Sequence, residues 1–294
     1  MINIKRILCP TDLTAHSENA VRYALALARA HEAELILFHC DVGGSNDKGE
    51  LEAALAEQAE VYDLAAVRLI VVEGEDVGEE ITRLAQSMRV DLIVMRSRRR
   101  PHRAALLGST AESVSRSAPC PVLVMHNDER DLLTDGGLQI GLKRVLVAYD
   151  FSDYAELALN YGLSLAQEHQ AALHLIHVLP PRSVSEPEIA WYPGNGETAY
   201  HSAARRLQHV VPPEVHLWCE ITNVVAEGNP YREILNYAER NQIDLICLGA
   251  HGVGFGMRAL FGSNVDRVLR QAPCPVLVAR PLKPISVQAA HQAA

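Results

Sequence analysis

Aromatic residues are scarce in this chain, and signals for a membrane or for secretion are absent. Only 5% of its 294 residues are Phe, Trp or Tyr, and its six cysteines form no C-x-x-C pair. No apolar run approaches the ~18 residues that a membrane-spanning helix needs. The first residues, MINIKRILCPTD, lack the apolar run and cleavage site of a signal peptide. We therefore expect a cytoplasmic protein with no membrane partner, whose cysteines are reduced and buried.

An excess of positive charge is also missing. Lys and Arg number 27 against 36 Asp and Glu, which gives a formal net charge of -9. This balance argues against nucleic acid and against an anionic membrane surface as partners. With 48% hydrophobic and 21% charged residues, the composition is that of a folded globular protein.

Histidine is frequent, with 13 residues, but its spacing does not indicate a metal site. His39 and His177 follow equivalent strand-like runs, which favours a structural role for both. His201 and His209 lack the i, i+4 spacing of a helical zinc pair. We expect no dedicated metal centre.

The chain repeats itself. KRILCPTD begins at Lys5 and KRVLVAYD at Lys143, and the sequence SAPCPVLV of the first half returns as QAPCPVLV in the second. Between these matches the second copy gains about 15 residues, placed most easily in the Pro- and Gly-rich stretch 179–200. We divide the chain into a domain at 1–126, a linker at 127–140, a domain at 141–282 and a tail at 283–294.

Each copy alternates strand-like and helix-like segments. In the second copy, the apolar run RVLVAY from residue 144 lacks period-2 alternation, as expected of a strand buried on both faces, and four more strand-like segments begin near residues 172, 222, 244 and 275. Helical segments separate them. The order predicts an α/β fold: two tandem doubly wound domains, each a mostly parallel five-stranded sheet with helices on both faces. Ligands of such folds bind at the carboxyl ends of the strands.

A glycine-rich stretch, GAHGVGFGMRALFGSN, follows the fourth strand of the second copy. Its spacing is G-x2-G-x9-G-S, from Gly249 to Ser263, and a helical pattern begins there with Ser263 as the expected cap. Glycines let a backbone approach an anion, and a helix N-terminus attracts negative charge. Asp150, at the end of the first strand, is placed to accept hydrogen bonds from a ribose or base. The alternative is a flexible loop before an ordinary capped helix.

This pattern resembles that of the universal stress protein family. The segments AYDFS, LIHV, VVAEGNPYREIL, DLICLGAHG and GMRALFGSNVDRVLRQAPCPVLV occur in that family's order and spacing. The resemblance implies that Asp150 and the backbone at Val178 contact adenosine. It implies that Gly249 and Gly252 line the path of the ribose and phosphates, and that the residues from Gly262 hold the phosphates of ATP, ADP or AMP with Mg²⁺ or Mn²⁺. The candidate binding residues are Tyr149, Asp150, Val178, Gly249, His251, Gly252, Arg258, Gly262, Ser263 and Asn264. Tyr149 is bulkier than the family's usual residue and is expected to narrow the adenine side.

The first copy departs from this motif. Asp12 is present, but Arg96 and Arg99 stand where the second copy has Gly249 and Gly252, and only Gly108-Ser109 survives of the remainder. We expect the first copy not to bind a nucleotide, because an arginine side chain would fill the ribose space. The arginines of 96–103 are left with three interpretations: an anion site, pairing across the domain interface, or a solvated loop.

Three functions are compatible with these residues. The favoured one is ATP binding in the second domain with a regulatory, stress-response role. The alternatives are a slow ATPase or other ATP-using enzyme, and a scaffold that works through the 181–198 loop with Trp191 and Tyr192. The family also implies that the last strands of the two copies pair within one chain, as a homodimer would. A further homodimer and protein partners are left open.

Overall fold

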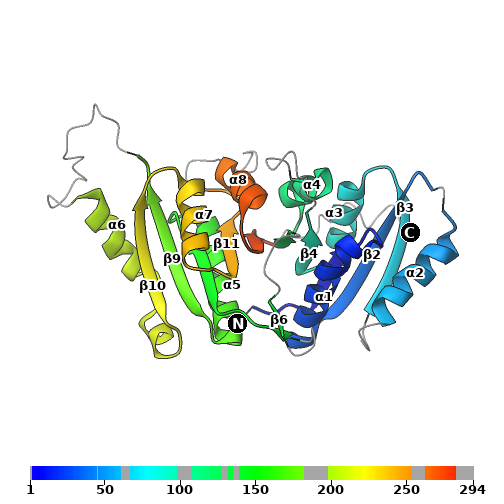
Figure 1. Cartoon of the computed structure of the whole chain (residues 1–294), viewed down its shortest axis with the longest axis horizontal. Coiled ribbons are helices and arrows are strands. Elements are labelled where there is room, and N and C mark those ends of the chain that lie inside the picture. Colours follow the sequence, from blue (N-terminus) through cyan, green and yellow to red (C-terminus); the bar gives the residue numbers. More distant parts are fainter. Residues whose placement is uncertain are drawn as a thin grey trace.

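The computed structural model describes residues 2–44, 46–60, 67–97, 107–126, 132–134, 139–181, 198–252 and 262–282. Two similar halves lie side by side (Figure 1), with the N-terminal half in blue and cyan and the C-terminal half from green to red. We call them repeat 1 and repeat 2.

Strands and helices alternate in both repeats, as the sequence predicts. Repeat 1 contains β1 (Arg6–Pro10), α1 (Ala15–Ala30), β2 (Glu34–Val42), α2 (Lys48–Glu60), β3 (Val67–Gly74), α3 (Val77–Ser87), β4 (Leu92–Arg96), α4 (Ser109–Ser117) and β5 (Val122–Met125). Repeat 2 contains β8 (Arg144–Ala148), α5 (Asp153–His169), β9 (Ala172–Leu179), α6 (Ala199–Gln208), a 3-10 turn (Pro213–Leu217), β10 (Ile221–Glu227), α7 (Pro230–Arg240), β11 (Leu245–Gly249), α8 (Ser263–Gln271) and β12 (Val276–Ala279).

Ten of these strands form one continuous sheet in the order β10-β9-β8-β11-β12-β5-β4-β1-β2-β3. Pairing is parallel within each repeat, and at the seam β12 and β5 pair antiparallel, with Leu277 opposite Leu123. The sheet confirms the α/β prediction and the pairing of the last strands. Each repeat hides one edge of its sheet against the other repeat.

Helices cover both faces of the sheet. The core on one face includes α1, α2, α5 and α6, and the core on the other includes α3, α4, α7 and α8. All six cysteines are free thiols and buried, as expected. No helix in the described ranges is long and apolar enough to cross a membrane.

The segment expected to be a linker holds two short strands, β6 (Leu133–Thr134) and β7 (Gln139–Ile140), which pair antiparallel. The backbone N–H of Leu132 donates to the Tyr23 hydroxyl at 2.7 Å, and Ile140 is buried in the core. This segment therefore packs against α1 instead of only joining the repeats. Trp191 and Tyr192 of the 181–198 loop lie outside the described residues.

Side chains of α4 and α8 join the two repeats on the second face. Arg270 of α8 forms an ion pair with Glu112 of α4 at 3.3 Å. Arg280, which follows β12, is only 6% exposed and donates to the carbonyls of Ser115, Arg116 and Ala118 at 2.7, 3.1 and 2.8 Å. A buried arginine of repeat 2 thus caps the C-terminal end of a repeat 1 helix.

Candidate functional site

The carboxyl ends of β8, β9 and β11 meet at one edge of repeat 2. The chain runs outward from β8 to β9 and β10, and then returns to the other side of β8 as β11. The space above β8 and β11 is therefore the topological switch point of this repeat, where ligands of open α/β sheets bind.

Asp150 lies at this point, in the turn between β8 and α5. Its Oδ1 atom accepts hydrogen bonds from the backbone N–H of Ser152 at 3.1 Å and from the Ser152 hydroxyl at 2.5 Å. Ser152 in turn caps α5 by accepting from the N–H of Ala155. Phe151 takes the left-handed conformation, with φ +64°. The carboxylate is thus held by its own turn, and this fixes its direction.

Gly249 and Gly252 are glycines because neighbouring groups leave no room for a side chain. A Cβ at Gly252 would lie 2.6 Å from Oδ2 of Asp150. A Cβ at Gly249 would lie 2.6–2.7 Å from backbone and Cβ atoms of Tyr154, in the first turn of α5. Gly252 therefore brings bare backbone against the carboxylate, whereas Gly249 allows the start of α5 to approach the end of β11.

The two ends of the glycine-rich loop are held together. The backbone N–H of Gly262 donates to the carbonyl of Ala250 at 3.4 Å. The prediction that Ser263 caps the helix is wrong by one residue: Gly262 is the N-cap of α8 and has no side chain to cap it, and Ser263 is the first helical residue. The first N–H groups of α8, which have no partner within the helix, thus lie beside exposed Ser263 and Asn264. Arg258 and the rest of 253–261 lie outside the described residues.

Two further candidate residues lie where β8 and β9 end: Tyr149 directly follows β8, and Val178 is near the end of β9. The ladder between β8 and β9 ends with the N–H of Tyr149 donating to the carbonyl of Ile176. Because backbone groups alternate with period two, the backbone of Val178 faces the same side one step beyond that ladder. The Tyr149 side chain is buried in the α5 face, where its hydroxyl donates to Glu156 at 2.6 Å. The Tyr149 side chain, which the sequence suggested would narrow the adenine side, therefore points into the core and not toward Asp150.

His177 has the structural role that the sequence predicts for it. Its Nδ1–H donates to the carbonyl of Tyr149 at 2.8 Å, and His39 makes the equivalent bond to Thr11 at 3.0 Å. Burial lowers the pKa of His177, so its imidazole is neutral near pH 7. Each histidine ties the turn after the first strand of its repeat to the second strand.

His251 begins the glycine-rich loop beside two residues of repeat 2. Its ring meets that of Tyr154 edge to face, with centroids 4.9 Å apart. Burial, followed by the positive charge of Arg280, lowers the pKa of His251. Since the N–H of Ala250 also donates to the carbonyl of Ala279, the loop start is fixed against the end of β12, one residue before Arg280.

Repeat 1 builds the same turn but has an arginine in place of the first glycine. Asp12 accepts from the backbone N–H and the hydroxyl of Thr14 at 3.1 and 2.6 Å, as Asp150 does from Ser152. Arg96, in place of Gly249, is half-buried at the end of β4, and the N–H of Gly108 lies 3.4 Å from the hydroxyl of Ser97. The arginines from Arg98 to Arg103, Arg99 included, lie outside the described residues.

Comparison with known proteins decides the family. The sequence model of the universal stress protein family matches residues 3–126 and 141–280. The chain belongs to the universal stress protein family. Both repeats are matched, in agreement with the tandem arrangement of the sheet.

Relatives include single and tandem universal stress proteins. One from Mycolicibacterium smegmatis is 28% identical over 94% of this chain and 97% of its own length. One from Thermus aquaticus is 32% identical over 47% of this chain and 98% of its own length. The crystal structure of a universal stress protein from Archaeoglobus fulgidus has a TM-score of 0.68 at 22% identity, covering 95% of this chain and 99% of that one. At that identity the likeness concerns the fold.

The sequence analysis did not identify three residues that lie near this site. Tyr154 fills the space above Gly249, and Arg280 lies beside His251. Arg267, one turn after Ser263 on α8, places its guanidinium 4.7 Å from the ring centre of Tyr231 on α7. Only Arg267 carried a signal, because residues i and i+4 share a helical face.

Proposed function

We propose that repeat 2 binds an adenine nucleotide at the edge formed by Asp150, Gly252 and the N-terminus of α8. The observation that carries this proposal is the close approach of Gly252 to the Asp150 carboxylate. Glycine backbone and a fixed carboxylate meet there at the switch point of the sheet, beside a helix whose N-cap residue is a glycine. A carboxylate accepts hydrogen bonds from ribose hydroxyls, and the helix end donates to phosphate.

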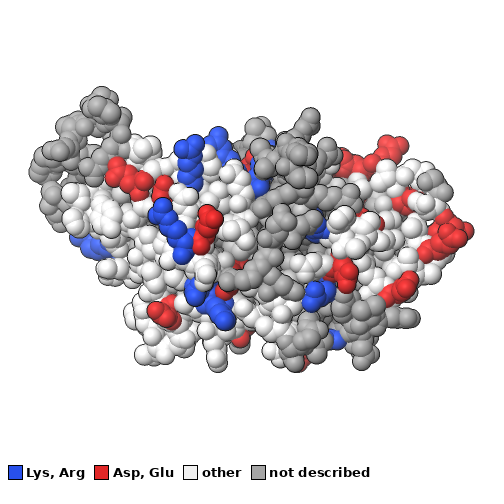
Figure 2. Space-filling view, in the orientation of Figure 1, with Lys and Arg blue, Asp and Glu red and all other residues white. Residues whose placement is uncertain are grey.

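The surface around α8 favours a polyphosphate. Lys and Arg side chains gather over the region of α7 and α8 (Figure 2), although the chain as a whole is acidic. Arg232 and Arg267 flank Tyr231 there, and together they lower the pKa of that phenol. We assign the terminal phosphates to the side of Arg267, since it shares a helical face with Ser263.

A divalent ion would be held through the phosphates. Within the described residues, no group of three or more His, Cys, Asp or Glu side chains lies together as metal ligands would. The donors beside α8 are N–H, hydroxyl and guanidinium groups, which suit an anion and not a bare cation. Mg²⁺ or Mn²⁺ therefore fits as a companion of the nucleotide, where it would neutralise phosphate charge.

The proposed role is regulatory rather than catalytic. The loop does not end in the G-K-[ST] sequence of a P-loop. Nucleotide occupancy would change the loop and the start of α8, and the chain would signal through partners. Turnover faster than about 1 s⁻¹, in the ordinary enzyme range, would contradict this role.

The first experiment measures the nucleotide carried by the purified protein. The chain is denatured and removed, and adenine nucleotides are separated and quantified per mole of chain. We expect about one per chain, with repeat 2 as the site. Absence of nucleotide, with no binding of added ATP and Mg²⁺ by calorimetry, would refute the proposal. About two per chain would show that repeat 1 binds as well.

Matched variants locate the site. Asp150→Asn keeps the size of the side chain and an oxygen for Ser152, and Gly252→Ala pushes a methyl group against the carboxylate; both should reduce nucleotide content. Asp12→Asn makes the same change in the equivalent turn of repeat 1 and should leave it unchanged. Equal losses in Asp12→Asn and Asp150→Asn would remove the assignment to repeat 2.

A further inference from the structure

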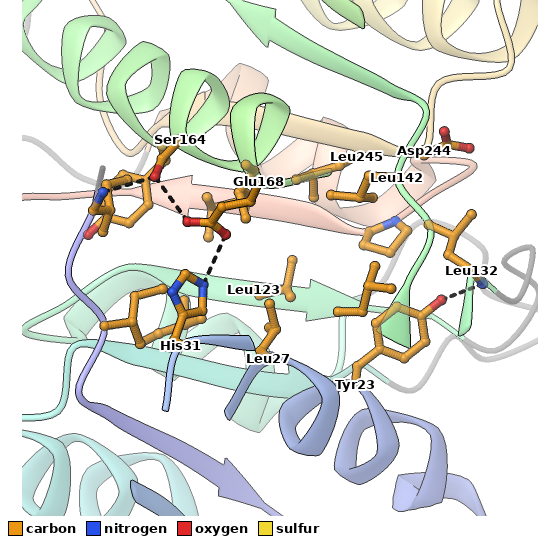
Figure 3. A pocket seen from close by; sticks show the side chains of 18 residues that line it. Tyr23, Leu27, His31, Leu123, Leu132, Leu142, Ser164, Glu168, Asp244 and Leu245 are labelled. Carbon is orange, nitrogen blue, oxygen red and sulfur yellow. Dashed lines mark hydrogen bonds and ion pairs between the residues drawn. The ribbon is translucent and has the colours of Figure 1, made fainter. Parts of the chain in front are cut away.

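A cavity of about 40 Å³ lies at the seam of the two repeats, away from the candidate nucleotide site. It lies between α1 of repeat 1 and α5 of repeat 2, over the antiparallel pair β5–β12 (Figure 3). Ile2 and Ile4 from the N-terminal segment, and Leu132 and Ile140 from the segment between the repeats, complete its wall. Its lining is mainly aliphatic.

Equivalent residues of the two repeats line this cavity. The pairs are Tyr23 and Tyr161, Leu27 and Leu165, Ile4 and Leu142, Leu92 and Leu245, and Leu123 and Leu277. Leu123 and Leu277 also stand opposite each other in the strand ladder. The cavity therefore lies on the pseudo-twofold axis that relates the repeats. In a tandem chain the two members of a pair can differ, so a larger side chain at one of them could fill the space on the axis. Here neither member of these pairs fills it.

The polar groups around the cavity are engaged with one another at its two ends. At one end the N–H of Ile2 donates to the Ser164 hydroxyl at 2.9 Å, and Ser164 donates to Glu168 at 3.3 Å. Glu168 also pairs with His31 of repeat 1 at 3.3 Å. At the other end, as Figure 3 shows, Tyr23 meets the backbone of Leu132.

Two further polar side chains of the lining are Asp244 and Tyr161. Asp244 accepts from the backbone N–H groups of Lys143 and Arg144 at 2.8 and 2.9 Å. Burial raises the pKa of Tyr161 to about 12, so this phenol adds no charge to the wall. Water needs two to four polar partners to stay in a cavity, whereas apolar cavities stay dry and accept apolar guests.

We propose that this axial cavity is a binding site for a small, uncharged apolar molecule or for the end of an alkyl chain. A guest there contacts both repeats and the segment between them. Its binding would therefore stabilise the docked arrangement of the repeats by mass action. The wall selects against charged and strongly polar ligands, because their groups would be buried without partners. This proposal is independent of nucleotide binding.

Xenon is the first probe, because it is apolar and small. Methyl NMR spectra of the full chain are recorded at increasing xenon pressure. We expect saturable shifts confined to the leucine methyls that line the cavity, including those of Leu27, Leu123 and Leu245, with a rise in the unfolding temperature. Unsaturable shifts spread over both repeats, or no shift, would overturn the proposal.

Two variants at one position provide the control. Leu27→Phe fills the cavity from α1 and should abolish the saturable shifts, whereas Leu27→Val enlarges it slightly and should retain them. Equal xenon shifts in the wild type and Leu27→Phe would place the guest elsewhere and refute the site. The companion change Leu165→Phe on α5 tests the same filling from repeat 2, so the test does not depend on how the phenylalanine at residue 27 packs.

Hexanol then distinguishes the two sources of an apolar group. If the end of an alkyl chain is the guest, hexanol should reproduce the leucine shifts and should fail to do so in Leu27→Phe. If xenon binds and hexanol does not, the guest is a free small apolar molecule. Shifts by hexanol that persist in Leu27→Phe would contradict binding of the chain end at this site.

Discussion

Replacing Arg280 by methionine should weaken the contact between the repeats. Methionine keeps an unbranched apolar stem but removes the guanidinium that donates to Ser115, Arg116 and Ala118 at 2.7, 3.1 and 2.8 Å. Ser115 and Ala118 are completely buried, so water cannot readily replace the lost donors. The carbonyls at the end of α4 would then be buried without partners.

The magnitude follows from two opposing terms. Each hydrogen bond from a charged donor is worth about 1.5–3 kcal/mol, and an acceptor left buried without a partner costs about 1–3 kcal/mol. Burial of Arg280 is itself costly, and it lowers the pKa of the guanidinium. Methionine relieves that cost. With two fully buried acceptors left unpaired at about 1–3 kcal/mol each, and part of that loss offset by the relieved burial of the guanidinium, we expect a loss of about 3 kcal/mol in the free energy of unfolding.

Urea unfolding and hydrogen exchange test this estimate. The midpoint should fall, and the amides of α4 should exchange faster than those of α3. Arg240→Met, at the exposed end of α7, is the control and should change stability by less than about 0.5 kcal/mol. A free energy of unfolding for Arg280→Met within that same margin of the wild type would refute the reasoning.

Three further predictions concern the loops and the pH. Gly249→Ala should destabilise repeat 2, because the new methyl group would meet backbone atoms of α5; a melting temperature equal to the wild type would contradict this. Arg96→Gly with Arg99→Gly should create a second nucleotide site, and unchanged stoichiometry in calorimetry would refute the idea that these arginines fill it. Stability should fall as the pH drops below about 6.5, because burial lowers the pKa of several histidines and the unfolded chain then binds more protons than the folded one. Urea midpoints compared at about pH 7.5 and about pH 5.5 measure this loss. These histidines are His169, His174, His177 and His251.

Much of the site was predictable because it is local in the sequence. Asp150 and Ser152 lie two residues apart, so a turn joins them wherever the repeat folds. The G-x2-G spacing likewise places Gly249 at the end of one strand and Gly252 three residues further along the same chain segment. The helix cap was misplaced by one residue because Gly262 and Ser263 both suit an N-cap, and only the backbone conformation decides between them.

The sequence by itself determined the repeat, the alternation of strand and helix, the parallel sheet and the residues at its carboxyl edge. Periodicity and internal similarity carry that information, because each element is defined by neighbours within a few residues. Only the tertiary structure decided that Tyr154 occupies the space above Gly249, that Arg280 caps a helix of the other repeat, and that paired leucines surround a cavity at the seam. Such contacts join residues that are far apart in the chain, and their distances depend on how whole elements pack.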